Sequence, residues 1–134
     1  MRVSETLGTI AALVFLAGCN AKTPADSVSS DRSANPQVTM TRVAKAMRNC
    51  WFTKKDPALR GFSMSPELNS LSGKPRILIV PRNNPGGLPK MVVQAERIGG
   101  RTQLTSFGPL VQSNDGPRLV AAVNNWGRGR TACA

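Results

Sequence analysis

The three cysteines carry the most reactive side chains in this sequence of 134 residues. Cys19 ends an uncharged apolar run that begins at Ile10, whereas Cys50 and Cys133 lie far apart in the rest of the chain. A thiol can act as a nucleophile, bind a metal ion, form a disulfide or accept a lipid. The sequence has no histidine, so it lacks the commonest base for a catalytic thiol and the commonest metal ligand. Disulfide formation and lipid attachment are therefore the chemistry to expect.

Residues 1–18 have the pattern of a secretory signal peptide, because a start whose only cation is Arg2 precedes a short apolar core and small residues. A membrane-spanning helix needs roughly 20 apolar residues, more than this core provides. Its end, Leu16-Ala17-Gly18-Cys19, resembles the lipobox of bacterial lipoproteins, although Glu5 offsets the charge of Arg2. The resemblance implies that the Cys19 thiol receives a diacylglyceryl group, that the chain is cut before Cys19 and that the new amine is acylated. The alternative is a buried helix that happens to end at a cysteine.

The resemblance implies a protein anchored to a membrane by lipid, since each buried methylene contributes about 0.8 kcal/mol. An Asp after the cysteine resembles an inner-membrane retention signal in enteric bacteria, and Asn20 stands there instead, so we expect the outer membrane. Residues 19–36 are then the lipidated cysteine and a flexible tether, because Ala21–Pro36 is rich in Ser, Ala, Pro and Asp. Residues 37–134 are expected to form one small basic domain, periplasmic or exposed at the cell surface.

The net charge of +11, from 18 basic and 7 acidic residues, predicts attraction to polyanions. An exported, lipid-anchored protein rarely meets nucleic acid. We therefore expect lipopolysaccharide phosphates, phospholipid headgroups, cell-wall carboxylates or another envelope protein as partners, and no nucleic acid. The alternative is that the charge only keeps a small domain soluble.

With Cys19 carrying lipid, Cys50 and Cys133 remain as a pair, and such a pair in an exported chain predicts a disulfide. The alternative, a catalytic thiol, has no histidine to activate it. Other catalytic patterns are also missing from the sequence. There is no phosphate-binding loop, no His/Cys metal set and no close pair of carboxylates, so we expect no enzyme, no cofactor and no metal.

Two amphipathic helices are predicted. Asn35-Pro36 can cap a first helix at about Gln37 to Phe52, whose apolar stripe runs from Met40 to Cys50 and whose other side carries basic residues. A second helix is expected from Asp115-Gly116-Pro117 to Gly127. Trp51 and Trp126 each end an apolar stripe, which favours core packing over a binding platform.

Three strands are predicted between the helices, at Arg76–Pro81, Lys90–Arg97 and Thr102–Phe107. Residues 59–68 alternate only in part, and Pro66 limits them to an edge strand or a loop. The expected fold class is α+β: helix, three-stranded antiparallel sheet and helix, with both helices on one sheet face and one disulfide as a staple.

The stretches "RVAKAMRNCW", "GKPRILIV" and "GPRLVAAVNNW" together resemble the periplasmic C-terminal domain of TolA and TonB. The resemblance covers Arg42 to Trp126. It implies a role in protein interaction within an envelope assembly or transport machine. The helical stalk and membrane-spanning segment of that family are absent, and the lipid anchor would replace them.

The sequence therefore favours a non-enzymatic outer-membrane lipoprotein whose basic domain docks on an anionic envelope component. The alternative is a TolA/TonB-like subunit that recognises another protein by strand addition to a sheet edge. The candidate anion- or partner-binding residues are Arg42, Lys45, Arg48, Arg82, Lys90, Arg128 and Arg130.

Overall fold

The computed structural model describes residues 27–31 and 35–133. The predicted signal peptide and Cys19 lie outside the described residues. The elements, in chain order, are β1 Ser27–Asp31, α1 Pro36–Met47, the π-helix η1 Arg48–Thr53, the 3₁₀ turn η2 Pro57–Leu59, β2 Phe62–Glu67, β3 Arg76–Pro81, β4 Met91–Ile98, β5 Arg101–Phe107, the 3₁₀ turn η3 Pro109–Gln112 and α2 Gly116–Gly127.

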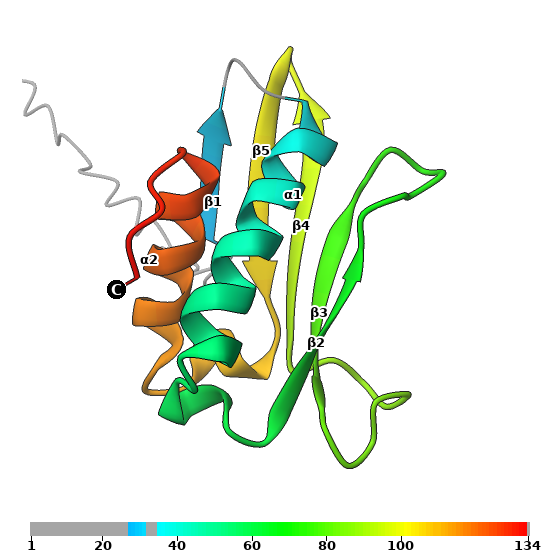
Figure 1. The fold of residues 1–134 in the computed structure, drawn as a ribbon. Coiled ribbons are helices and arrows are strands. Elements are labelled where there is room, and N and C mark those ends of the chain that lie inside the picture. The colour runs from blue at the N-terminus through cyan, green and yellow to red at the C-terminus, as the bar shows by residue number, and fades with distance from the viewer. Residues whose placement is uncertain (1–26, 32–34, 134) are drawn as a thin grey trace, which may run out of the picture.

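The strands form one antiparallel sheet in the order β1-β5-β4-β3-β2 (Figure 1). The three predicted strands are confirmed as β3, β4 and β5, and the α+β class is confirmed with them. The predicted number of strands is wrong, because two edge strands join this centre. One of them, β2, is the segment with Pro66, and a proline fits an edge strand because only one side of that strand has to bond to a neighbour.

The other added strand, β1, comes from the segment expected to be a structureless tether. It pairs with β5 from Ser27 opposite Ser106 to Asp31 opposite Thr102. The composition predicted no regular structure here because most side chains of the segment are small or polar. An edge strand, however, is held by main-chain hydrogen bonds to its neighbour and needs little apolar side chain of its own. Within the expected tether, Ser27–Asp31 therefore belongs to the sheet.

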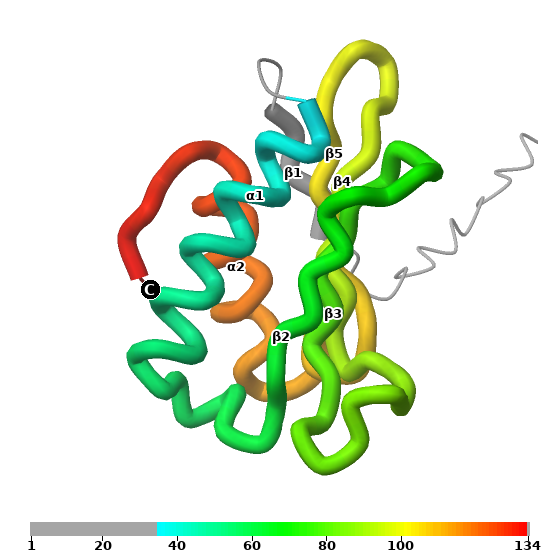
Figure 2. The backbone as a smooth tube through the Cα atoms, turned by 45° about the vertical axis from the view of Figure 1, so that its right-hand side comes forward, coloured from blue at the N-terminus to red at the C-terminus, as the bar shows by residue number. Residues whose placement is uncertain are grey.

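Both helices lie on the same face of the sheet, as predicted (Figure 2). α1 begins where expected, because the Asn35 side chain accepts a hydrogen bond from the Val38 N–H at 2.8 Å. The predicted helix to Phe52 corresponds to α1 and η1 together. α2 ends at Gly127, and the chain then turns back through Gly129, whose φ is +88°.

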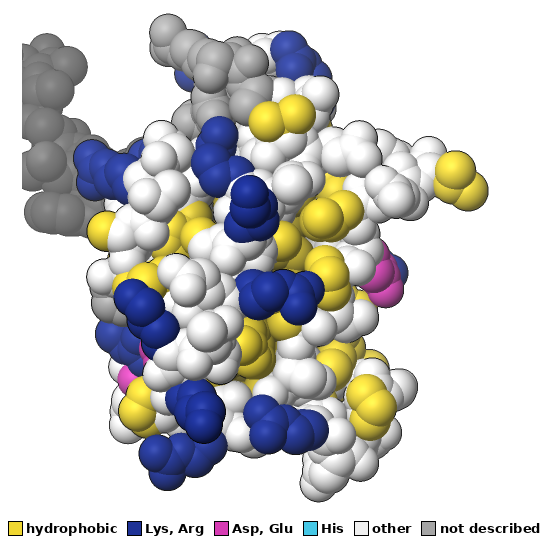
Figure 3. Space-filling model, viewed as in Figure 1, with side chains coloured by type: hydrophobic (Ala, Val, Ile, Leu, Met, Phe, Trp, Pro, Cys, Tyr) yellow, Lys and Arg dark blue, Asp and Glu magenta, His cyan; other side chains and the backbone are white. Residues whose placement is uncertain are grey.

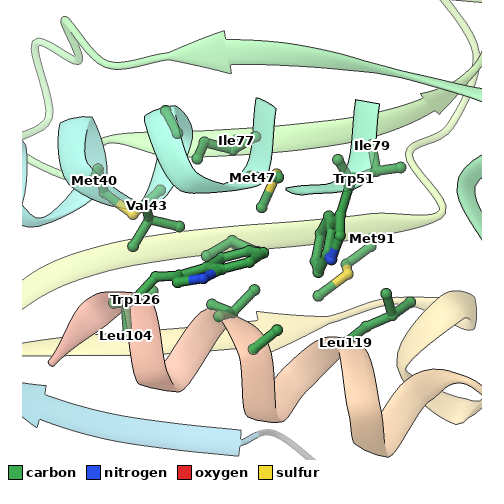
Figure 4. Close-up of a cluster of buried hydrophobic side chains, with 14 of the residues drawn as sticks. Met40, Val43, Met47, Trp51, Ile77, Ile79, Met91, Leu104, Leu119 and Trp126 are labelled. Carbon is green, nitrogen blue, oxygen red and sulfur yellow. The ribbon is translucent and has the colours of Figure 1, made fainter. Parts of the chain in front are cut away.

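The core lies between the helices and the sheet, with the two tryptophans near its middle (Figure 4). Trp51 and Trp126 are 1% and 0% exposed, and their rings meet edge to face with centroids 5.1 Å apart. The predicted core role of both residues is confirmed. The sheet contributes a continuous apolar floor to this core: Ile77, Ile79, Met91, Val93, Ala95 and Leu104.

The predicted disulfide is present and joins Cys50 of η1 to Cys133, with the two Cα atoms 5.3 Å apart. It closes a loop whose ends are 83 positions apart. The Trp126 indole N–H donates to the carbonyl of Ala132 at 3.0 Å, which fixes the same tail a second time. The C-terminal tail, residues 128–133, therefore runs from the end of α2 back along that helix to η1 (Figure 1).

One glycine stands where the backbone of a preceding turn leaves no room for a side chain. A Cβ on Gly116 would lie 2.0 Å from the carbonyl oxygen of Val111. Gly116→Ala should therefore displace the start of α2 from η3 and lower the free energy of unfolding by about 3 kcal/mol, the upper end for overpacked sites. Urea unfolding measures the loss. Gly86→Ala, with nothing within 4 Å of the new Cβ, is the control, and equal stability of the two variants would contradict this packing.

Candidate functional site

Basic side chains are spread over the side of the molecule that carries the helices, and few acidic side chains accompany them (Figure 3). Lys45 of α1 and Arg48, the first residue of η1, are exposed, because the apolar stripe of α1 turns toward the sheet. Arg128 and Arg130 are exposed on the C-terminal tail. The disulfide holds that tail against η1, so four of the candidate residues lie on one side of the fold. We call Lys45, Arg48, Arg128 and Arg130 the basic helix face.

Arg42 was predicted to belong to this face, but its side chain binds backbone carbonyls of α2. Its guanidinium is half-buried and donates from Nε to the carbonyl of Trp126 at 2.9 Å and from Nη2 to that of Gly127. These carbonyls end α2, where a cation offsets the negative end of the helix dipole. The structure therefore gives Arg42 a structural role, joining α1 to the end of α2. The helix pattern could not reveal this, since it depends on how the two helices pack.

A groove of about 770 Å³ runs along α1 toward the C-terminal tail. Val38, 52% exposed, and Ala46 give it apolar surface, while Lys45 brings a positive charge and Thr131 of the tail closes one side. Such a groove can accommodate an apolar group next to an anion.

Arg82 and Lys90 flank the loop between β3 and β4 and do not line this groove. The Arg82 N–H donates to the Gly61 carbonyl at 2.9 Å, and its Nη2 donates to the Phe62 carbonyl at 3.2 Å. Arg82 lines a separate pocket together with Lys55 and Arg60. Those two cations were missed from the sequence, although the run "KKDPALR" displays them close together around a turn.

The acidic residues of the domain are paired with other cations. Lys74 and Glu96 are 2.7 Å apart, and Arg76 pairs with Glu67. Arg118 binds Asp56 through both terminal nitrogens, Nη1 to Oδ2 at 2.7 Å and Nη2 to Oδ1 at 3.0 Å, and also reaches Asp115. In residues 35–133, the carboxylates Asp56, Glu67, Glu96 and Asp115 are thus engaged away from the basic helix face.

The hydrogen bonds from Arg118 hold the pKa of Asp56 below its ordinary value. A carboxyl with a lowered pKa stabilises the fold above its unfolded pKa, and this contribution is lost as the pH falls through the folded value. We expect Asp56→Asn to lower the free energy of unfolding at pH 7 by about 1–2 kcal/mol, since Arg118 is partly exposed. Melting temperatures between pH 2 and 7 measure this. The gap between wild type and variant should narrow in acid, and a constant gap would contradict the assignment.

Within residues 27–31 and 35–133, no group of three His, Cys, Asp or Glu residues could hold a metal ion. No helix in that part of the chain is long and apolar enough to cross a membrane. Comparison with protein families, with curated proteins and with solved structures finds no match for the chain. What it does chemically must therefore be argued from its own residues.

Proposed function

We propose that this chain is a non-enzymatic lipoprotein of the outer membrane whose basic domain docks onto an anionic envelope component: lipopolysaccharide, phospholipid or peptidoglycan. The observation that supports this most is the basic helix face, where four cations are exposed while Asp56, Glu67 and Glu96 are paired with other cations. A surface of unpaired positive charge attracts polyanions of several chemical kinds, since it recognises charge before shape.

The strength of such docking comes from several weak contacts. An exposed ion pair contributes about 0–1 kcal/mol, so one cation would not hold the domain on a surface. Salt also screens exposed charges over about 8 Å at physiological ionic strength. We therefore expect binding that needs several members of the basic helix face and that weakens as salt is raised.

The proposed lipid on Cys19 would make weak docking sufficient. The stretch between Cys19 and Ser27, where β1 begins, reaches at most roughly 28 Å when fully extended. The domain would then remain near the membrane, and its second contact would be effectively intramolecular. Mass spectrometry of protein extracted from native membranes tests the anchor. We expect an N-terminal peptide that begins at an acylated Cys19, and an unmodified thiol in an uncut chain would refute it.

The role of the basic helix face in binding is tested by two double variants that each remove two positive charges from different parts of the surface. The chain from residue 19 contains all of the described fold, and Cys19→Ser removes the lipid from the experiment. In this background, Lys45→Gln with Arg48→Gln should weaken binding to anionic vesicles about 3–10-fold, as expected for two exposed pairs. Arg97→Gln with Arg101→Gln removes the same charge at the exposed turn between β4 and β5 and is the control. Equal losses would show that only the net charge matters.

A second candidate, a TolA/TonB-like protein-interaction subunit, is favoured by the position of β2 at the sheet edge. The Arg82 N–H donates to the Gly61 carbonyl, and residues of an antiparallel pair alternate between bonding their neighbour and facing away from it. The backbone groups of Phe62, Met64 and Pro66 therefore face away from β3, toward the open edge of the sheet. Pro66 has no N–H to donate, which shortens the usable edge. Binding of a partner strand would depend little on salt and would be blocked by Met64→Pro but not by Met64→Leu.

A further inference from the structure

We propose that the pocket lined by Lys55, Arg60 and Arg82 binds a phosphate group, either as a phosphomonoester headgroup of an envelope lipid or as a soluble phosphate. We call it the three-cation pocket. The inference rests on the proposed function and names the ligand class within it. The pocket measures about 340 Å³, near the lower end of the roughly 300–1,000 Å³ of small-ligand sites, and so suits a headgroup better than an acyl chain.

Three segments that are separate in the sequence bring the cations together. Lys55 follows η1, in a turn fixed by the hydrogen bond from the Asp56 N–H to the Trp51 carbonyl at 2.9 Å. Arg60 follows η2, and Arg82 follows β3, where its Nη2 is held by the Phe62 carbonyl. The remaining guanidinium donors of Arg82 are available for a ligand in the pocket that it lines.

The backbone at Lys55 adds a second indication. Its φ is +56°, which makes it the one non-glycine residue in the left-handed region among those described. Residues in that region persist where surrounding contacts fix them, and they cluster at ligand sites. A glycine or asparagine would adopt this conformation at less cost, yet the position carries a cation that faces the pocket.

Asp56 also lines the pocket, and its charge would repel an anion if it were free. The structure commits that carboxylate elsewhere: Arg118 binds both oxygens, and the Ala58 N–H donates to Oδ1 at 3.0 Å. Only 9% of the Asp56 side chain is exposed. The pocket therefore presents an excess of positive charge, and that excess is what a phosphate dianion requires.

The chemistry of the lining selects phosphate over a single carboxylate. Three cations that line one pocket gain more from a doubly charged, compact anion than from a singly charged one. Arginine also matches phosphate oxygens with paired N–H donors. Phe52 and Leu59 give the pocket an apolar wall that a glycerol or sugar carbon chain could contact. The larger groove along α1 lacks this arrangement, because Arg42, one of its two cations, is engaged with the end of α2.

The test uses the chain from residue 19 with Cys19→Ser, and two probes. Inorganic phosphate is titrated while backbone amide shifts are followed, and vesicles containing phosphatidic acid, a phosphomonoester, are compared with vesicles of phosphatidylglycerol at matched surface potential. Lys55→Gln with Arg60→Gln should weaken phosphate binding at least tenfold, whereas Lys45→Gln with Arg48→Gln should leave it within twofold. Lys55→Gly is a second variant, because glycine accepts the positive φ and keeps the fold while the cation is removed.

The outcomes separate this inference from the proposed function. Loss of both phosphate and phosphatidic acid binding in the pocket variants supports a lipid headgroup, and loss of phosphate binding alone supports a soluble ligand. Unchanged phosphate binding in both pocket variants overturns the inference. It is also overturned if phosphate shifts the backbone amide signals of all exposed cations equally, because binding would then not be confined to the pocket. If the pocket variants bind phosphate normally but the Lys45/Arg48 variant loses vesicle binding, the proposed role of the basic helix face holds and only the phosphate site is refuted.

Discussion

Replacing Cys50 and Cys133 together by alanine is expected to lower the free energy of unfolding by about 4–5 kcal/mol. The reason is entropic: the bond closes a loop whose ends are 83 positions apart, and its loss frees that loop in the unfolded chain. For a small domain this is a large share of a total stability of about 5–15 kcal/mol. Urea unfolding of the oxidised wild type and the double variant measures it.

Dithiothreitol provides the matched control, because reduced wild type should unfold at the same urea concentration as the double variant. The tail is also attached by the hydrogen bond from Trp126 to the Ala132 carbonyl, but this bond closes only a local turn. A difference below about 1 kcal/mol between oxidised wild type and the double variant would mean that the disulfide does not restrain the unfolded chain.

Trp126→Ala should have the second large effect, a loss of about 3–5 kcal/mol. The ring is completely buried, packs edge to face on Trp51 and binds the tail through its indole N–H. The aromatic contact adds about 0.5–1.5 kcal/mol to the burial of area. Urea unfolding gives the total, and near-ultraviolet circular dichroism reports the environment of the remaining Trp51.

Trp126→Phe separates the contributions, because it keeps an aromatic ring and removes the indole donor. We expect it to cost roughly 1–2 kcal/mol, which combines the lost hydrogen bond with some lost volume. If Trp126→Ala were no more destabilising than Trp126→Phe, the ring would not be the centre of the core.

Periodicity and terminal residues were sufficient to predict the centre of this fold. β3 has the predicted bounds, β4 is displaced by one residue at both ends, and β5 begins one residue earlier than predicted. These strands were predictable because glycine and proline border them in the sequence. α2 ends at the glycine expected to stop it, and Asn35 caps α1. These features are local, so they can be read before any packing is known.

The edge strands could not be predicted in the same way. Ser27–Asp31 has one large aliphatic residue and so shows no strand pattern. Phe62–Glu67 lies in a segment that alternates only in part and contains a proline, so its sequence left an edge strand and a loop open. Both are strands because a neighbour offers a free row of backbone groups. That condition belongs to the assembled sheet and leaves little signature in the segment itself.

In the candidate site, too, the residues whose position depends on a single element were predicted, and those whose position depends on tertiary packing were not. Lys45 and Arg48 were predicted as surface cations because they lie opposite the apolar stripe of one helix. The cap that Arg42 forms depends on the packing of two helices, and the pocket of Lys55, Arg60 and Arg82 depends on three chain segments that meet only in the folded domain. Counting cysteines predicted the disulfide, since pairing needs no knowledge of the fold.

Docking of the basic helix face on an anionic envelope surface can be measured by co-sedimentation with lipid vesicles. The chain from residue 19 with Cys19→Ser is mixed with neutral phosphatidylcholine vesicles and with vesicles that also contain phosphatidylglycerol or lipopolysaccharide, at increasing salt. We predict binding to the anionic vesicles alone, and its loss as salt rises toward 1 M, where the screening length is about 3 Å. Equal binding to neutral and anionic vesicles, or binding to anionic vesicles that does not change with salt, would contradict electrostatic docking.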